Sequence, residues 1–505
     1  MLQRYVKKIL AARVYDVAEE SELSPAPLLS HRLGNEVLFK REDTQPVFSF
    51  KLRGAYNRMV QLSPEALERG VITASAGNHA QGVALAAREL NCPATIVMGV
   101  NTPDIKINAV RARGARVVLH GDTYNDAARH AQALQAEHGY TYVHPFDDPD
   151  VIAGQGTIGV ELLHQCPDLN VIFVPVGGGG LLAGIAAYVK YLRPEIKVIG
   201  VEAEGSACLA AARAANRRVR LRYEDLDLFA DGVSVAQVGK ETFRVIQRCI
   251  NEPVLTVSTD EICGAIRDVF DDTRSIAEPA GALAVAGMKK WVEQTGAEGL
   301  KMAAIVSGAN VNFDRLRHIS ERAEVGEHRE AVLAVMIPEK PGSFRRFCRT
   351  LGKRNITEFN YRYSHSGAAQ VFVGLQIRSS DDRQQITERL LSEGYSVEDM
   401  TDNEMAKLHV RHMVGGRAPV DERLFRVEFP ERPGALLRFL SGLPKRWNIS
   451  LFHYRNHGSA WGRVLVGLQV PSGENAAIPE FFSAIGYRYW EETENAAYQR
   501  FLRTE

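Results

Sequence analysis

Short apolar segments alternate with helix-forming segments between about residues 68 and 310. The apolar segments are rich in Val, Ile and Ala and predict strands at residues 71–74, 94–98, 115–119, 171–176, 197–201 and 302–306. The segments between them, such as residues 82–90 and 122–137, combine Ala with Glu and Arg. Nearly continuous apolar strands separated by helices predict parallel sheets with helices on both faces. We therefore expect an α/β part whose ligands bind where the strands end.

The pattern changes after about residue 325, where an internal repeat begins. The segment Ile337–Gly342 (IPEKPG) returns as Phe429–Gly434 (FPERPG), and Val371–Ile377 returns as Val464–Val470. Each copy predicts a strand, a Pro-Gly turn, an amphipathic helix and two alternating strands. Because α+β units this small seldom have a strong core of their own, we expect the two units to pack on each other.

Composition narrows the class of protein. The chain has 505 residues, enough for about three domains. Lys plus Arg and Asp plus Glu both number 61, so the net charge is zero and no global positive field attracts nucleic acid. The six cysteines form no C-x-x-C pair, which predicts reduced, mostly buried thiols in a cytoplasmic protein. A basic run in the first repeat is interpreted as a solvated helix face; it consists of Arg345, Arg346, Arg349, Lys353 and Arg354.

One uncharged stretch, Val171 to Val189, has the length of a membrane span. Pro175 and the glycines at 177–180 interrupt it, so we interpret it as a buried strand, a glycine turn and a buried helix. No membrane partner is expected. The chain also lacks the motifs H-E-x-x-H, G-x-S-x-G and Walker A, and no metal site is predicted.

Lys51 is the first residue that points to chemistry, in the run Ser49–Ala55 (SFKLRGA). By itself it fits an ordinary solvated charge. A desolvated amine beside the cation of Arg53 would instead have a lowered pKa. Such an amine supplies the free base that forms a Schiff base with a carbonyl compound.

The second candidate is the turn Thr73–Gly82 (TASAGNHAQG), which follows a predicted strand and opens a helix. Its small residues let backbone N–H groups point into one concavity, which suits a carboxylate. The alternative is a helix cap formed by Ser75 or Asn78.

The third candidate is the run Gly177–Gly184, again between a strand and a helix. Four successive glycines expose N–H donors to a phosphate at a helix N-terminus. However, Gly178, Gly180 and Ala183 also fit the dinucleotide fingerprint, and Glu202 ends the next predicted strand, where a ribose-binding acid would lie. A nicotinamide enzyme is therefore an alternative at this point.

Two further turns carry polar residues. Ser307, in Ser307–Asn310, follows a predicted strand and either caps the next turn or bonds the ring nitrogen of a cofactor. Glu278 opens the turn Glu278–Ala282 and is interpreted as a helix-start charge that complements the helix dipole.

Together these motifs resemble those of the fold-type II (tryptophan synthase β-like) pyridoxal-phosphate enzymes, and most closely the biosynthetic, allosteric threonine deaminases, or threonine dehydratases. The resemblance covers almost the whole chain, and the runs SFKLRGA and SAGNHAQG are very specific to it. It implies an α/β catalytic domain with two open parallel-type sheets over residues 1–322, in which about residues 50–150 form a smaller subdomain. It also implies two α+β ACT-like regulatory domains, at residues 329–400 and 423–494.

The resemblance implies a role for each motif residue. Lys51 forms the internal aldimine with pyridoxal 5'-phosphate and removes the substrate α-proton, while Phe50 flanks the ring. Asn78 bonds the ring hydroxyl and Ser307 bonds the pyridine nitrogen. The cofactor phosphate is held by Gly177, Gly178, Gly179, Gly180 and Leu181. The substrate carboxylate binds the loop that contains Ser75, Ala76, Gly77 and His79.

The implied reaction converts L-threonine to 2-oxobutanoate and ammonia, the first committed step of isoleucine biosynthesis, with L-serine as a secondary substrate. Isoleucine as inhibitor, valine as activator and a homotetramer follow from the same resemblance. We expect effector contacts near the repeated strand residues, although core packing is favoured for the two phenylalanines; these residues are Phe359, Tyr361, Phe452 and Tyr454.

One alternative function is disfavoured, and two others stay open beside threonine deamination. The nicotinamide alternative is disfavoured because it leaves Lys51 and the Asn78 loop without a role. An enzyme of the same cofactor class that acts on serine or on a racemisation substrate remains, because one methyl group gives only about 1–3 kcal/mol of discrimination. A non-catalytic amino-acid sensor on the same scaffold is the third possibility, and the intact Lys51 argues against it.

Overall fold

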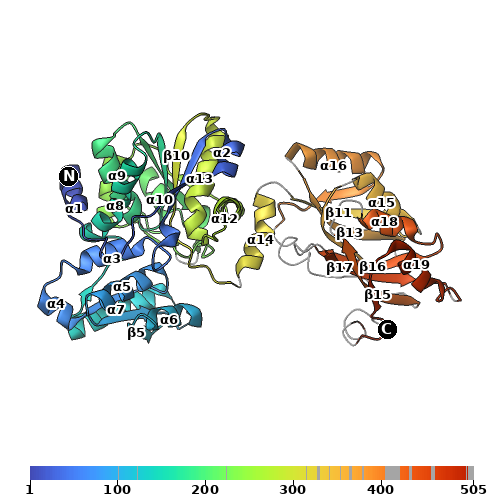
Figure 1. The fold of residues 1–505 in the computed structure, drawn as a ribbon, viewed down its shortest axis with the longest axis horizontal. Coiled ribbons are helices and arrows are strands. Elements are labelled where there is room, and N and C mark those ends of the chain that lie inside the picture. The colour runs from blue at the N-terminus through green and yellow to red at the C-terminus, as the bar shows by residue number, and fades with distance from the viewer. Residues whose placement is uncertain are drawn as a thin grey trace. The chain divides into compact units, whose positions relative to one another are not determined.

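The computed structural model divides into two compact units, Met1–Gly326 and Glu327–Glu505 (Figure 1). The first unit holds all the candidate catalytic residues, and the second holds the internal repeat. The structure describes residues 1–100, 102–121, 123–222, 225–313, 315–326, 330–340, 342–352, 354–362, 367–377, 380–403, 421–430, 435–455, 461–471, 473–495 and 498.

A six-stranded sheet lies at the centre of the first unit, in the order β1-β2-β10-β7-β8-β9. β1 and β2 are antiparallel, and every other neighbouring pair is parallel, as the sequence predicts. The strands are β1 (Leu23–Pro25), β2 (Glu36–Arg41), β7 (Val171–Pro175), β8 (Lys197–Ala203), β9 (Leu255–Val257) and β10 (Lys301–Val306).

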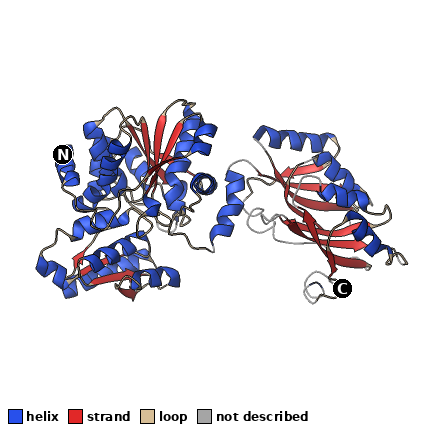
Figure 2. Ribbon diagram, in the orientation of Figure 1, coloured by secondary structure: helices blue, strands red, loops and turns tan. Residues whose placement is uncertain are grey.

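Helices cover both faces of this sheet (Figure 2). On β7, Ile172 and Val174 face one helical layer, whereas Val171 and Phe173 face the other. Because both faces are buried, the strand is apolar at every position. The first layer contains α1 (Leu2–Leu10), α8 (Pro149–Gln165), α9 (Gly180–Leu192), α10 (Cys208–Ala214) and α11 (Lys240–Cys249). The second contains α2 (Pro27–Leu33), α12 (Thr259–Thr273), α13 (Pro279–Thr295) and α14 (Arg315–Gly326).

A second, smaller sheet is wholly parallel, in the order β5-β4-β3-β6. Its strands are β3 (Val71–Ala74), β4 (Ala94–Met98), β5 (Arg116–Leu119) and β6 (Thr141–Tyr142). The accompanying helices are α3 (Lys51–Met59), α4 (Pro64–Arg69), α5 (Asn78–Glu89), α6 (Asp104–Arg111) and α7 (Tyr124–His138). α3 packs on both α5 and α8, so the helix that begins with Lys51 joins the two sheets. Two 3₁₀ turns complete the unit, η1 (Glu42–Thr44) and η2 (Glu204–Ser206).

In the second unit the two repeats form one antiparallel eight-stranded sheet, in the order β14-β11-β13-β12-β16-β17-β15-β18. The repeats meet at β12 and β16, where Phe359 lies opposite Tyr454 and Tyr361 lies opposite Phe452. The two repeats therefore associate edge to edge within the second unit. The strands are β11 (Glu330–Pro338), β12 (Ile356–Arg362), β13 (Ala368–Gln376), β14 (Ser396–Asp399), β15 (Glu422–Pro430), β16 (Asn448–Arg455), β17 (Trp461–Gln469) and β18 (Tyr489–Glu491).

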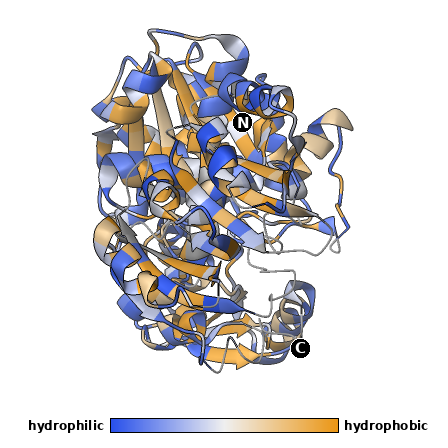
Figure 3. Ribbon diagram, turned by 90° about the vertical axis from the view of Figure 1, so that its right-hand side faces the viewer, coloured by the Kyte–Doolittle hydropathy of each residue, from blue (hydrophilic) through white to orange (hydrophobic). Residues whose placement is uncertain are grey.

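Four helices share one continuous core with this sheet: α15 (Ser343–Leu351), α16 (Ser380–Ser392), α18 (Ala435–Gly442) and α19 (Ala477–Ile485). Each repeat thus has a second helix and a fourth strand that the pattern did not predict. Hydrophobic and hydrophilic residues alternate along the helices in Figure 3, because each helix has one buried and one exposed face.

The cysteines and the uncharged stretch lie in the first unit, except for Cys348 in the second. All six cysteines are buried thiols without a disulfide. The uncharged stretch at 171–189 forms β7 and most of α9, as predicted. Among the described residues, no helix is both long enough and apolar enough to cross a membrane.

Candidate active site

Lys51 is the first residue of α3 and lies where β10 ends. Ser49 forms an isolated β-bridge with Gly308, and the N–H of Phe50 donates to the carbonyl oxygen of Ser307 (3.3 Å). The Lys51 amine donates to the carbonyl oxygen of Pro145 (3.1 Å) and lies 5.1 Å from the centre of the Phe50 ring. The predicted lysine and serine sites are therefore neighbours.

Burial lowers the pKa of the Lys51 amine to about 8, and the Glu278 carboxylate opposes that shift. The lowered pKa and desolvation as its cause were both expected, but the second expected cause, the cation of Arg53, does not contribute. Arg53 is fully buried and points into a cluster of acids, where it pairs with Glu42 (2.8 Å) and Glu161 (2.5 Å). The expectation that the cation of Arg53 lowers the pKa of Lys51 is therefore wrong, because paired carboxylates neutralise that cation.

The glycine run lies between β7 and α9. Gly179 has φ +90°, a backbone conformation that other residues rarely adopt. A Cβ atom on Gly178 would come closer than 3.0 Å to the ring of Phe146, and one on Gly177 would lie 2.9 Å from the backbone of Val233. Only glycine fits at these positions, so the backbone itself forms the surface of the turn.

The backbone N–H groups of residues 177–181 donate to no acceptor within the described part of the chain. Free donors at the start of a helix are the usual means of holding a phosphate. The Phe146 ring lies against this turn, and the carbonyl of the preceding residue, Pro145, accepts the hydrogen bond from Lys51. The glycine turn and the lysine therefore face the same loop.

Asn78 is the first residue of α5, and its side chain does not cap that helix. Its Nδ2 donates to Oε1 of Glu278 (2.5 Å), and its Oδ1 accepts from Nδ2 of Asn310 (2.6 Å). The helix starts within the run Thr73–Gly82 that was predicted to open it, and the Asn78 side chain is turned toward α13 and β10.

The loop that precedes α5 is organised around Ser75. Its N–H donates to the carbonyl oxygen of Val97 (3.1 Å), and its hydroxyl accepts from the N–H of Gly77 (3.3 Å). Among the described residues, the N–H groups of Ala76, Asn78 and His79 have no acceptor. These donors at the start of a helix suit an anion, as predicted for the loop.

The ring of His79 is buried beneath this loop, with 3% of the residue exposed. Its Nε2 lies 2.9 Å from the carbonyl oxygen of Val143, which makes Nε2 the protonated nitrogen. Burial, reinforced by the charge of Lys51, lowers the pKa of the ring to about 3, so it is neutral. A substrate contact by His79 would therefore use its backbone N–H.

Ser307 follows β10 and is buried. Its hydroxyl donates to the carbonyl oxygen of Ala280 (3.3 Å), and its N–H donates to that of Gly281 (3.3 Å). The start of α13 is thus tied to the end of β10. Glu278 lies at the start of α13, as predicted, but its side chain makes no cap hydrogen bond and accepts from Asn78 instead.

Glu202 decides between the two interpretations of the glycine run. Its buried carboxylate accepts the N–H groups of Leu209 and Ala210, both at 2.8 Å, at the start of α10. It caps a helix, and no ribose-binding role remains for it. The nicotinamide alternative is therefore wrong.

Comparison with known proteins agrees with this geometry. The family described as "Pyridoxal-phosphate dependent enzyme" matches residues 15–308, and "C-terminal regulatory domain of Threonine dehydratase" matches residues 321–410 and 415–502. The biosynthetic L-threonine dehydratase of Burkholderia multivorans is 57% identical over 99% of each chain. The chain belongs to the family of biosynthetic threonine dehydratases.

Solved structures support the same membership. The processed threonine deaminase isoform 2 from Solanum lycopersicum superposes with a TM-score of 0.63 at 51% identity, over 64% of this chain and 88% of that one. Maize serine racemase gives 0.59 at 30% identity, over 64% of this chain and 98% of that one. The predicted fold class, the pyridoxal-phosphate cofactor and the ammonia-lyase class of enzyme are confirmed.

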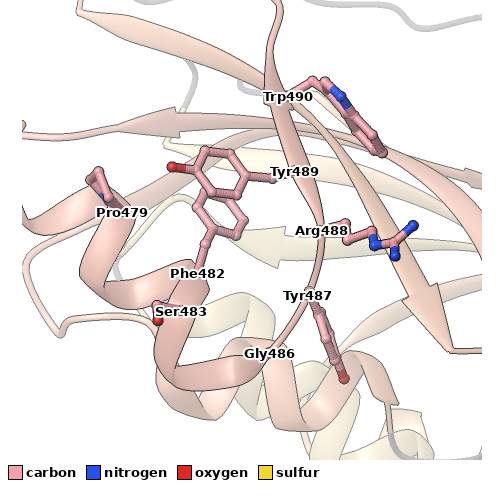
Figure 4. Close-up of a pocket in the computed structure, with 8 residues that line it drawn as sticks. All are labelled: Pro479, Phe482, Ser483, Gly486, Tyr487, Arg488, Tyr489 and Trp490. Atoms are coloured by element: carbon pink, nitrogen blue, oxygen red, sulfur yellow. The ribbon is translucent and has the colours of Figure 1, made fainter.

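The second unit contains an open hollow of about 460 Å³ between α19 and β18. Figure 4 shows the ring of Phe482 beside that of Tyr489, and the two stack with centroids 4.0 Å apart. The hollow is lined by Pro479, Phe482, Ser483, Gly486, Tyr487, Arg488, Tyr489 and Trp490. None of these was singled out from the sequence.

The four strand residues that were singled out in the repeats lie where the repeats join. Phe359 and Phe452 are buried in the core, as favoured for them. Tyr361 is buried and its hydroxyl donates to Glu339 (2.9 Å), while Tyr454 is partly buried.

Proposed function

We propose that the chain converts L-threonine to 2-oxobutanoate and ammonia, with L-serine as a secondary substrate. The observation that carries this proposal is the full-length identity with a protein named biosynthetic L-threonine dehydratase, together with an intact Lys51 site. The proposed place of the reaction is the first committed step of isoleucine biosynthesis, in the cytoplasm.

The residues present fit pyridoxal phosphate, which supplies an electron sink for the substrate Cα when it is bound. The glycine turn at 177–181 offers unused N–H donors to its phosphate, where a Cβ would fill the space. Asn78 has one uncommitted N–H for the ring hydroxyl, and Phe50 flanks the ring. The Ser307 hydroxyl would form a hydrogen bond with the pyridine nitrogen. Because this hydroxyl is neutral, it supplies no full charge there. Negative charge at the substrate Cα would then be less delocalised into the ring, which favours prompt loss of the β-hydroxyl.

Two groups of the chain act on threonine in this proposal. The N–H groups of the Ser75–His79 loop bind its carboxylate and orient the Cα–H bond. The Lys51 amine, with its pKa lowered to about 8, takes the α-proton at Nζ near neutral pH.

Regulation is assigned to the second unit. Isoleucine inhibits and valine relieves inhibition through the domains at residues 329–400 and 423–494, in a homotetramer. Effector contacts are proposed near Tyr361 and Tyr454, at the joint between β12 and β16. Support comes from the match to a regulatory domain of threonine dehydratase and from the two-fold arrangement of the repeats.

An activity on serine, or racemisation, is the second candidate, because maize serine racemase shares the catalytic fold. One assay separates these functions. The purified protein with pyridoxal phosphate is given L-threonine or L-serine, with and without isoleucine, and 2-oxobutanoate, pyruvate and D-serine are measured. We expect 2-oxobutanoate in excess, suppressed by isoleucine; dominant D-serine or pyruvate, or a colourless inactive protein, contradicts the proposal.

A further inference from the structure

Three side chains from distant parts of the sequence form a hydrogen-bonded row in the site. Asn310, after β10, donates through Nδ2 to the carbonyl oxygen of Val47 (2.8 Å) and to Oδ1 of Asn78 (2.6 Å). Asn78, at the start of α5, donates through Nδ2 to Oε1 of Glu278 (2.5 Å), just before α13. The row therefore links both sheets of the first unit.

The backbone carbonyl of Val47 determines the orientation of the whole row. A carbonyl oxygen only accepts, so the atom of Asn310 that faces it is Nδ2. That same Nδ2 then requires an acceptor, Oδ1, on Asn78. Consequently Nδ2 of Asn78 faces Glu278, whose Oε1 accepts.

Burial of the Glu278 carboxyl group is unfavourable for its charged form. It is 5% exposed, and burial raises the pKa of its carboxyl group to about 7, although hydrogen bonds from Asn78 and the backbone of Asn310 oppose the shift. A Cβ atom on Gly308 would come closer than 3.0 Å to Oε1, so a glycine there makes room for the acid. The carboxyl group does not cap α13. The hydrogen bond with Asn78 therefore explains a buried acid at this position better than a helix cap does.

Asn78 has one hydrogen left over. An amide nitrogen carries two, and Glu278 takes one; the other has no acceptor within the described residues. With both ends of its amide held, Asn78 cannot rotate to use this hydrogen elsewhere. We propose that Glu278 is a positioning residue that dedicates the second Nδ2 hydrogen of Asn78 to the ring hydroxyl oxygen of pyridoxal phosphate. This inference rests on the cofactor site proposed above.

The test measures the affinity and the absorption spectrum of the bound cofactor, in the full-length protein. Glu278→Ala frees the Asn78 amide, and we expect the dissociation constant of pyridoxal phosphate to rise about tenfold or more. The visible absorption band and its pH dependence should change as well, because the ring hydroxyl oxygen loses a fixed donor. Glu278→Gln keeps an acceptor for Asn78, so it should restore much of the affinity.

A double-mutant cycle asks whether Glu278 acts through Asn78. In an Asn78→Ala background, Glu278→Ala should have little further effect on either readout. Asn310→Ala releases the other end of the Asn78 amide, so its effect should resemble that of Glu278→Ala. The second variant keeps the test available if the first fails to fold. Glu202→Gln is the matched control, because it alters a buried acid of similarly raised pKa whose hydrogen bonds go to the start of α10 and to the Cys208 thiol, not to Asn78.

The outcomes are distinct. An unchanged dissociation constant and spectrum in Glu278→Ala, or an equally large effect in the Asn78→Ala background, overturns the positioning role while leaving the proposed function intact. Wild-type protein that takes up no pyridoxal phosphate overturns both.

Discussion

At the scale of single residues, the proposed reaction depends on Lys51, whose pKa burial lowers. We expect Lys51→Ala to lose threonine turnover entirely, because the variant lacks the amine that takes the α-proton in the proposed reaction. Borohydride reduction of the wild-type protein with pyridoxal phosphate should label the peptide that contains Lys51, as read by mass spectrometry. A label on another lysine would falsify the site assignment.

The pKa of Lys51 makes a second prediction. Only the neutral amine attacks an aldehyde, and burial lowers its pKa from 10.5 to about 8. The rate at which cofactor-free protein takes up pyridoxal phosphate should therefore rise with pH up to about 8 and then level off. A free lysine derivative, measured alongside, should continue to gain rate toward pH 10.5. A protein profile that follows the free lysine contradicts the lowered pKa.

The glycine turn gives a third prediction at this scale. Gly178→Ala places a methyl group against the Phe146 ring and should cost about 1–3 kcal/mol of stability and weaken cofactor binding. Gly159→Ala is the control, because a Cβ there meets its neighbours only at 3.4 Å or more. Thermal unfolding with and without pyridoxal phosphate gives both quantities. Equal behaviour of the two variants would show that the turn yields without strain.

At the scale of elements, α3 is held by the buried cluster around Arg53. The guanidinium group bonds Glu42 and Glu161, and Glu161 also pairs with Lys40 (2.7 Å). β2, α3 and α8 meet in this cluster. The helix that begins with Lys51 is thereby fixed against both neighbours.

Arg53→Ala should therefore destabilise the first unit by about 3–5 kcal/mol, because it leaves Glu42 buried without its paired cation and leaves Glu161 with Lys40 alone. Arg88→Ala removes an arginine that pairs with its neighbour Glu89 on the surface, and should change stability by less than about 0.5 kcal/mol. Denaturant unfolding of both variants measures the contrast. Similar midpoints would mean that Arg53 contributes little to holding α3.

At the scale of the whole molecule, the proposed function assigns the chemistry to the first unit and its control to the second. Deletion of residues 327–505 should abolish the response to isoleucine and leave threonine turnover. Maize serine racemase matches 64% of this chain over 98% of its own, an extent close to that of the first unit. Circular dichroism checks that the shortened chain is folded. Inhibition by isoleucine that survives the deletion contradicts this division.

The sequence by itself determined the α/β class, the repeat and most of the motifs. Lys51 and the glycine run are visible because local constraints act on neighbouring residues: a buried strand must be apolar at every position, and a backbone phosphate site excludes side chains. Long-range contacts leave no such pattern. The pairing of β12 with β16, the ring of Phe146 against Gly178, and the hydrogen bond from Asn78 to Glu278 were decided only by the tertiary structure. Each of these contacts depends on which distant segments meet. From the sequence alone, Glu278 is interpreted as a helix-start charge, because its partner Asn78 lies 200 residues away in the chain.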